Sequence, residues 1–277
     1  MTPEEYCQRK AQASGSSFYT SFFFLPPMRR RAITALYAYC REVDDVVDES
    51  TDASEAARQL EKWRGEIEDL YAGAPKHPVT RALLPFLSEF HLPKARFLEI
   101  IDGMEMDLRQ ARYPDFDALV LYCYRVAGAV GLLAVEIFGR REEATCDYAC
   151  ALGTALQLTN IVRDVAEDAA RGRIYFPLDE LARFGVSEDD ILALRDSEGF
   201  RRLMPFQIAR AERFYAEAGR ALPDADRKAQ RPGLVMAAIY RAVLDEIKRD
   251  PAQVLTRRVS LSTWKKLRTA ALAWIRG

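Results

Sequence analysis

Histidine is nearly absent from this sequence: only His77 and His91 occur among its 277 residues, and each lies close to a proline. Zinc hydrolases, histidine-based catalytic triads and most transition-metal centres depend on imidazole groups, so this shortage argues against all three. The five cysteines contain no C-x-x-C pair, and their odd number does not suit a closed disulfide framework. Chemistry in this protein is therefore expected to rely on carboxylates, arginines and aromatic rings.

A large excess of either charge is also missing, because 40 Lys and Arg residues face 41 Asp and Glu residues. Nucleic-acid-binding proteins usually need a marked positive excess, so no nucleic-acid partner is expected. The longest apolar run, Val126–Val135, is far shorter than a membrane span and contains two glycines, so no spanning helix is expected. The N-terminus has no basic segment leading into an apolar run. The cysteines are interpreted as buried free thiols. Together, these features predict a cytoplasmic protein.

Glycine and proline are sparse, and they punctuate the chain rather than form linkers. Between them lie segments in which apolar residues recur at intervals of three and four, as on one face of an α-helix. Asp115 follows Pro114 and precedes a long apolar run, which predicts a helix N-cap. No strand-like alternation and no internal repeat is visible. The sequence predicts an all-α protein with about eight to ten helices in a single domain over residues 1–277.

Between residues 37 and 48, one helical stripe carries two carboxylates, a guanidinium and a phenol. At about 100° per residue, a stripe roughly 60° wide contains Tyr37, Arg41, Asp44 and Asp48. The two aspartates are four residues apart, and such a pair repels unless positive charge lies between them. By itself, this pattern also fits a solvated acidic face in which Arg41 is an intrahelical partner.

A second stripe of the same kind lies between residues 157 and 171. In one predicted helix, an arc of about 80° contains Gln157, Asn160, Asp164, Asp168 and Arg171. Amide side chains beside an apolar surface suggest groups that coordinate a ligand rather than groups that are only hydrated. Two D-x-x-x-D stripes in one chain therefore predict a shared site.

Ligand sets made only of oxygen select hard cations, and Mg²⁺ prefers a few carboxylates together with water and phosphate oxygens. Two facing stripes would hold about two or three Mg²⁺ ions that grip a diphosphate between them. Charge-assisted hydrogen bonds would complete the clamp from Arg41, Arg163, Arg171 and Arg173. Departure of the diphosphate would leave a carbocation in an apolar cavity, where aromatic rings stabilise positive charge.

A di-metal carboxylate bundle of the ferritin-like kind is the chief alternative at the level of residues. That design uses Glu-x-x-His on two helices. Neither His77 nor His91 has a glutamate three residues before it, which argues against this alternative.

At these motifs the chain resembles the squalene/phytoene synthase family of head-to-head prenyl transferases, from about Tyr6 to Trp274. Two signatures carry the resemblance, over residues 37–48 and residues 157–168, and the second continues into Arg173, Tyr175 and Pro177. Further matches lie at Ser17, Tyr122, Gly128, Gly131, Tyr240 and Arg258. Counting from Tyr240 instead favours Arg257 as the late arginine, so both assignments stay open.

The resemblance implies an all-α isoprenoid synthase fold in which both aspartate motifs face a deep apolar cavity. It implies Mg²⁺ ligands at Asp44, Asp48, Asn160, Asp164 and Asp168. It also implies diphosphate-binding residues at Ser17, Tyr37, Arg41, Gln157, Asn160, Arg163, Arg173, Tyr175, Tyr240 and Arg258. Tyr122 lies where the family places a phenol near the reacting carbons, for proton handling or cation stabilisation; the alternative is a core tyrosine.

Within the family, stretches such as Cys40–Asp48 and Ile101–Asp107 most resemble the presqualene diphosphate synthases of bacterial hopanoid synthesis. The chain is therefore expected to join two farnesyl diphosphates into presqualene diphosphate, without NADPH. The alternatives are a phytoene synthase acting on two geranylgeranyl diphosphates, a squalene synthase that uses NADPH, and a helical assembly protein that has kept only the fold. A peripheral contact with the inner membrane surface is a further option, through the apolar residues 22–28; a buried loop is the favoured interpretation there.

Overall fold

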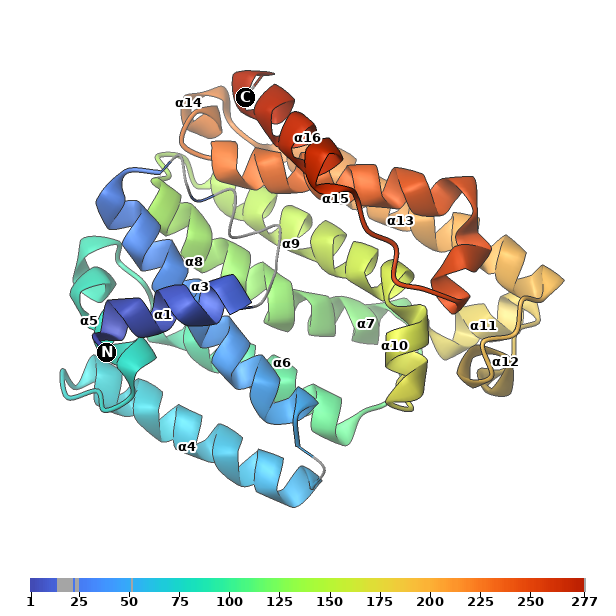
Figure 1. The fold of residues 1–277 in the computed structure, drawn as a ribbon, viewed down its shortest axis with the longest axis horizontal. Coiled ribbons are helices and arrows are strands. Elements are labelled where there is room, and N and C mark those ends of the chain that lie inside the picture. Colours follow the sequence, from blue (N-terminus) through green and yellow to red (C-terminus); the bar gives the residue numbers. More distant parts are fainter. Residues whose placement is uncertain (14–21, 23–24, 51, 277) are drawn as a thin grey trace.

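The computed structural model describes residues 1–13, 22, 25–50 and 52–276, and Ser17 lies outside this part of the chain. The described residues form helices and no sheet, with one isolated bridge between Arg112 and Ile174. The helices of the first part are α1 (Pro3–Ala13), α3 (Pro27–Asp48), α4 (Ala53–Tyr71), α5 (Pro78–Glu89) and α6 (Lys94–Arg109). The predicted all-α architecture is confirmed for the described residues (Figure 1).

The second part begins with a continuous helix made of α7 (Phe116–Cys123), the π-helical turn η2 (Tyr124–Gly128) and α8 (Ala129–Phe138). Asp115 caps its N-terminus as predicted, since its side chain accepts a hydrogen bond from the backbone N–H of Ala118. The remaining helices are α9 (Ala144–Arg163), α10 (Val165–Ala170), α11 (Leu178–Phe184), α12 (Glu188–Leu192), α13 (Glu198–Ala221), α14 (Asp224–Arg227), α15 (Arg231–Arg249), the 3₁₀ turn η3 (Pro251–Leu255) and α16 (Thr263–Arg276). The shortest of these have too few turns to display a helical period in the sequence.

Two hydrophobic clusters fill the interior. One is built mainly by α3 to α6 and α8, and the other mainly by α7, α9, α13 and α15. Val126 packs against both clusters. In Figure 1, α3, α8 and α9 lie side by side across the centre of the molecule, so the continuous helix stands between the two clusters.

Two glycines allow neighbouring helices to approach η2 closely. A Cβ atom on Gly103 of α6 would lie 2.7 Å from Val126 Cγ1. A Cβ atom on Gly153 of α9 would lie 2.7 Å from the backbone oxygen of Ala127. Because real Cβ atoms do not come this near, only glycine lets α6 and α9 pack on the π-helical turn from two sides. Turns of this type often occur at functional sites.

One helix in the described chain, Phe116–Phe138, is long and apolar enough to cross a membrane by length and composition. Half of its most apolar window is buried inside the fold. Its central position accounts for that apolar character, because both clusters pack on it.

The five cysteines are free; Cys7 and Cys123 are buried, whereas Cys40, Cys146 and Cys150 are only half-buried.

Candidate active site

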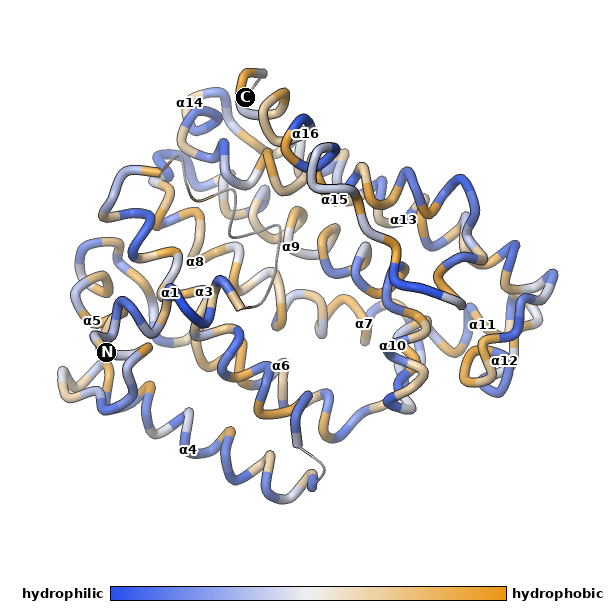
Figure 2. Tube along the Cα trace, viewed as in Figure 1, coloured by the Kyte–Doolittle hydropathy of each residue, from blue (hydrophilic) through white to orange (hydrophobic). Residues whose placement is uncertain are grey.

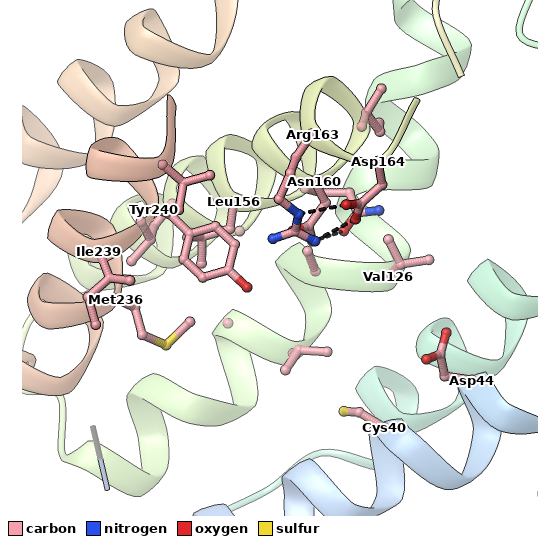
Figure 3. Close-up of a pocket in the computed structure, with 18 of the residues that line it drawn as sticks. Cys40, Asp44, Val126, Leu156, Asn160, Arg163, Asp164, Met236, Ile239 and Tyr240 are labelled. Atoms are coloured by element: carbon pink, nitrogen blue, oxygen red, sulfur yellow. Dashed lines mark hydrogen bonds and ion pairs between the residues drawn. The ribbon is translucent and has the colours of Figure 1, made fainter. Parts of the chain in front are cut away.

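A cavity of about 750 Å³ lies where the two predicted motifs meet. Every candidate site residue within the described chain lines it, namely Tyr37, Arg41, Asp44, Asp48, Tyr122, Gln157, Asn160, Arg163, Asp164, Asp168, Arg173, Tyr175, Tyr240 and Arg258. Figure 3 shows Asp44 on α3 across open space from Asn160, Arg163 and Asp164, with Tyr240 on a third side. Side chains far apart in the sequence therefore share one cavity.

The first motif lies on the last turns of α3, on the face predicted from its spacing. The Arg41 guanidinium forms ion pairs with Asp44 and Asp45. Asp45 does not line the cavity; it is bound on its other side by Lys10 of α1, at 2.8 Å. Burial raises the pKa of the Asp44 carboxyl to about 6, although Arg41 lowers it. Of these two neighbouring carboxylates, only Asp44 therefore lines the cavity.

The second motif does not lie on one helix, which corrects the prediction for residues 157–171. α9 ends at Arg163, α10 begins at Val165, and Asp164 between them has φ −100° and ψ 19°. The backbone N–H of Asp164 still donates to the oxygen of Asn160, and that of Asp168 to the oxygen of Asp164. Aspartate competes for backbone hydrogen bonds and is a weak helix former, so a break at this residue is physically reasonable. Across the break, Asp164 therefore still lies one turn after Asn160, and Asp168 one turn after Asp164.

Arginines after α10 connect the two motifs. Arg173 contacts Asp48 at 3.1 Å and Arg171 contacts it at 3.4 Å, from the loop after α10 to the end of α3. Burial, and then the charge of Asp164, raise the pKa of the Asp168 carboxyl to about 8. The two aspartate stripes therefore face each other, and negative charge is only partly compensated between them.

This donor set fits a hard divalent cation. Its ligands are all oxygens, and the side-chain oxygen of Asn160 is buried without a hydrogen-bond partner. Within the described chain, however, no three acidic, histidine or cysteine side chains already form a compact ligand group. Instead, Asp44, Asp48 and Asp164 are each paired with arginines. A cation would therefore have to exchange places with guanidinium groups.

Asp107 of α6 is a site residue that we did not predict as one. It lines the cavity and accepts hydrogen bonds from the hydroxyl groups of Tyr122, at 3.0 Å, and Tyr175, at 2.8 Å. The two tyrosine rings stack with centroids 5.2 Å apart. Burial raises the pKa of the Asp107 carboxyl to about 6, while Arg173 lowers it. One signal could have found it: Asp107 falls on the same side of α6 as buried apolar residues, where carboxylates are rare.

Burial also raises the pKa of the Tyr122 phenol well above its ordinary value. Tyr122 is 4% exposed, and its hydroxyl donates to a carboxylate, which further disfavours loss of its proton. Tyr122 is thus a protonated phenol on the cavity wall. Its oxygen can accept a further proton only if the hydroxyl proton of Tyr122 passes to Asp107.

Of the two late arginines, the structure places Arg258 at the cavity. Its Nε atom lies 3.2 Å from an oxygen of Asp164. Arg257 is exposed, and its guanidinium donates to the side chain of Gln253. Nearby, the Arg163 guanidinium lies over the Tyr240 ring, 5.9 Å from its centroid.

Away from the carboxylates, the cavity wall is mostly apolar. It is formed by side chains such as Val130, Ala134, Phe138, Leu152, Leu156, Met236 and Ile239. The cavity thus has an end rich in carboxylates and guanidinium groups and a hydrocarbon-like remainder. An amphipathic molecule with a strongly anionic head and a long apolar chain has the matching chemistry.

Comparison with known proteins agrees with this chemistry. The chain matches the family model for squalene/phytoene synthase over residues 11–265. A phytoene synthase from Arthrospira platensis is 39% identical, with 98% of this chain and 92% of that protein covered. A 15-cis-phytoene synthase from Synechocystis is 38% identical, with 98% of this chain and 84% of that protein covered.

Solved structures share the fold, which confirms the predicted isoprenoid synthase fold. A squalene synthase from Alicyclobacillus acidocaldarius superimposes with a TM-score of 0.80 at 31% identity, covering 90% of this chain and 94% of that one. A dehydrosqualene synthase in complex with a ligand superimposes with a TM-score of 0.87 at 28% identity, covering 99% and 96%.

One prediction is wrong. From its sequence, the chain is expected to make presqualene diphosphate from two farnesyl diphosphates for hopanoid synthesis. Curated relatives that are 36–39% identical over nearly the whole chain are instead phytoene synthases, which favours the phytoene alternative. Because the resemblance rests on aspartate motifs that both enzyme types share, those motif residues do not separate the two.

Proposed function

The chain belongs to the squalene/phytoene synthase family, and on that basis we propose that it joins two molecules of geranylgeranyl diphosphate head to head into phytoene. The observation that carries the proposal is the single cavity in which both aspartate motifs meet an apolar wall. The choice of phytoene is supported by the names of its relatives.

The proposed reaction balances without a reductant. The C1–oxygen bond of one diphosphate breaks, C1 bonds to the C2–C3 double bond of the second molecule, and a proton leaves; the product is a cyclopropylcarbinyl diphosphate. Loss of the second diphosphate and of a second proton then gives the hydrocarbon. No hydride is added, so NADPH is not expected to take part.

Guanidinium groups at the polar end would bind the diphosphates through charge-assisted hydrogen bonds. Five line the cavity and are paired with motif aspartates: Arg41 with Asp44, Arg163 and Arg258 with Asp164, and Arg171 and Arg173 with Asp48. A diphosphate that attracts these arginines would release the carboxylates from them. The same exchange would therefore prepare the anion site and the cation site together.

The released oxygens of Asp44, Asp48 and Asp164, together with those of Asn160 and Asp168, would hold Mg²⁺, which when bound neutralises diphosphate charge and so assists its departure. The chain itself supplies the rest of the environment. Apolar side chains exclude water from a developing allylic cation, and the stacked rings of Tyr122 and Tyr175 offer π faces to it.

Product analysis tests this proposal. Purified protein with Mg²⁺ and no NADPH is expected to convert geranylgeranyl diphosphate to phytoene, identified by chromatography and mass spectrometry. Its kcat/KM for farnesyl diphosphate should be at least about tenfold lower, because a shorter chain leaves apolar wall unfilled. A higher kcat/KM for farnesyl diphosphate, or a hydrocarbon that forms only with NADPH, would contradict it.

The late arginine gives a second test. Arg258→Ala is expected to lower kcat/KM for geranylgeranyl diphosphate by about 10- to 100-fold, because one charge-assisted contact to diphosphate is lost. Arg257→Ala is the matched control, since it removes the same charge one residue away and outside the cavity; a change within about twofold is expected. Equal losses in the two variants would argue against a role for Arg258 at the diphosphate.

A further inference from the structure

The cavity extends along α9, away from the carboxylates. Its lining residues follow most of this helix, from Asn160 near the C-terminus back to Tyr148 near the N-terminus. At a rise of about 1.5 Å per residue, the levels of these two residues are roughly 18 Å apart along the helix axis. Figure 3 shows Met236 on the side of Tyr240 that is away from Asp164, in the apolar part of the cavity. Tyr148 therefore marks the end that is remote from the proposed diphosphate site.

Three helices meet at this remote end. Gly233 of α15 lies against the Tyr148 side chain, because a Cβ atom on this glycine would be 2.5 Å from Tyr148 Oη. Gln230, directly before α15, donates from its side-chain amide to the backbone oxygen of Val135 on α8, at 3.4 Å. All four residues line the cavity, and the side chains of Tyr148 and Gln230 are buried. We call these four residues the floor of the cavity, since α15 joins α8 to α9 there.

The floor is polar although the wall that leads to it is not. Tyr148 Oη and Gln230 Oε1 are both buried without a hydrogen-bond partner in the described chain. Helix α8, by contrast, is mostly hydrophobic along its length (Figure 2). Burial raises the pKa of the Tyr148 phenol, so its hydroxyl stays neutral and keeps its proton. A hydrocarbon that covered these two polar atoms would give neither of them a hydrogen bond, which is unfavourable.

The depth of the floor corresponds to a definite length of isoprenoid chain. Each isoprene unit adds four carbon–carbon bonds of about 1.5 Å in a zigzag, and therefore about 5 Å of extended chain. Four units span about 20 Å, which is close to the roughly 18 Å between the levels of Asn160 and Tyr148. A chain of three units would stop short of Tyr148, and a chain of five units would have to pass it.

We propose that Tyr148 and Gln230 determine the longest isoprenoid chain that the enzyme accepts, and that they set this limit at four units. For the class of substrate, the inference rests on the proposed function. The limit itself follows from the position and polarity of the floor, which lies outside both aspartate motifs.

Binding of unreactive probes tests the floor without turnover. Alkyl bisphosphonates with tails of twelve, sixteen and twenty carbons have the main-chain lengths of three, four and five isoprene units. Calorimetry with Mg²⁺ is expected to show about tenfold tighter binding for sixteen carbons than for twelve, because more apolar surface is buried. The twenty-carbon probe should bind about tenfold more weakly than the sixteen-carbon probe, since its end meets the floor.

Variants of Tyr148 should move this limit. Tyr148→Ala opens space beside Gly233 and is expected to tighten binding of the twenty-carbon probe at least about tenfold, with little change for the twelve-carbon probe. Tyr148→Phe keeps the ring and removes only the hydroxyl, so it should tighten binding of the twenty-carbon probe about threefold.

Tyr113→Phe is the matched control. Tyr113 Oη is also buried without a hydrogen-bond partner in the described chain, but Tyr113 does not line the cavity. This variant should leave the dependence of binding on tail length unchanged. If circular dichroism shows that Tyr148→Ala does not fold, the comparison of Tyr148→Phe with Tyr113→Phe decides.

Turnover gives a second reading. Tyr148→Ala should raise kcat/KM for the five-unit diphosphate, relative to the four-unit diphosphate, by at least about tenfold. Affinity that keeps rising up to twenty carbons in the unmodified chain would overturn the inference. So would variants of Tyr148 that fold and keep the length dependence of the unmodified chain. If these variants move the binding limit but the unmodified chain makes no phytoene, the proposed function fails and the floor stands.

Discussion

Replacing Asp168 with asparagine is expected to abolish turnover and, at the same time, to stabilise the metal-free protein. The Asp168 carboxyl lies among other carboxylates, and its pKa is raised to about 8 by burial and by Asp164. Asparagine has nearly the same shape and no charge to desolvate. The loss of a Mg²⁺ ligand should lower kcat by about 10³-fold or more.

The sign of the stability change follows from proton linkage. An unfolded aspartate loses its proton near pH 4, whereas the folded protein keeps the Asp168 proton up to about pH 8. The folded state therefore binds more protons within this window, and its stability falls as pH rises through it. At pH 8 Asp168→Asn should raise the melting temperature by roughly 5 °C, and at pH 4.5 by little.

Thermal melts with and without Mg²⁺ complete this test. Mg²⁺ with inorganic diphosphate should raise the melting temperature of the unmodified chain more than that of Asp168→Asn, and EDTA should remove activity. Asp45→Asn is the control, because Asp45 does not line the cavity and binds Lys10 and Arg41. It should retain most activity and lose a little stability. If Asp168→Asn instead melts earlier and loses its helical signal, the aspartate is a structural residue.

The sequence was informative about this site where the chemistry depends on local spacing. Asp44 and Asp48 lie one turn apart on α3, and helical geometry alone places them on one face. The same reasoning located Asn160 and Asp164, although it missed the break at Asp164. That break goes with tertiary contacts: Asp164 is held by Arg258, which is far away in the sequence.

Features that depend on packing could not be predicted in this way. Asp107 acquires its surroundings from Tyr122 and Tyr175, which belong to other segments. The apolar wall of the cavity is built by side chains from several helices, so its shape leaves no pattern in one sequence. The close approach of α6 and α9 to η2, which Gly103 and Gly153 allow, likewise becomes visible only in three dimensions.

Asp107→Asn is expected to lower kcat by about 10²-fold while KM for the diphosphate changes little. Asp107 contacts no diphosphate-binding arginine by an ion pair; it accepts the hydrogen bonds of two phenols. A proton released from the substrate can pass to the Tyr122 oxygen only if the Tyr122 proton passes to Asp107. Asparagine fills the same space but is a far weaker proton acceptor, so the step should slow without loss of binding.

The pH profile separates this role from a purely structural one. Burial holds the pKa of Asp107 at about 6, so activity of the unmodified enzyme should fall as pH drops below 6, where the carboxyl becomes protonated. In Asp107→Asn that acidic limb should become less steep, because one titrating group is gone while Asp44, whose pKa burial also raises to about 6, remains. Asp102→Asn is the control on the same helix, since Asp102 pairs with Arg64 and does not line the cavity. This variant should keep the kcat of the unmodified enzyme and the same acidic limb of its pH profile. A limb of unchanged steepness in Asp107→Asn would assign it to other groups and leave Asp107 as a residue that only positions Tyr122 and Tyr175.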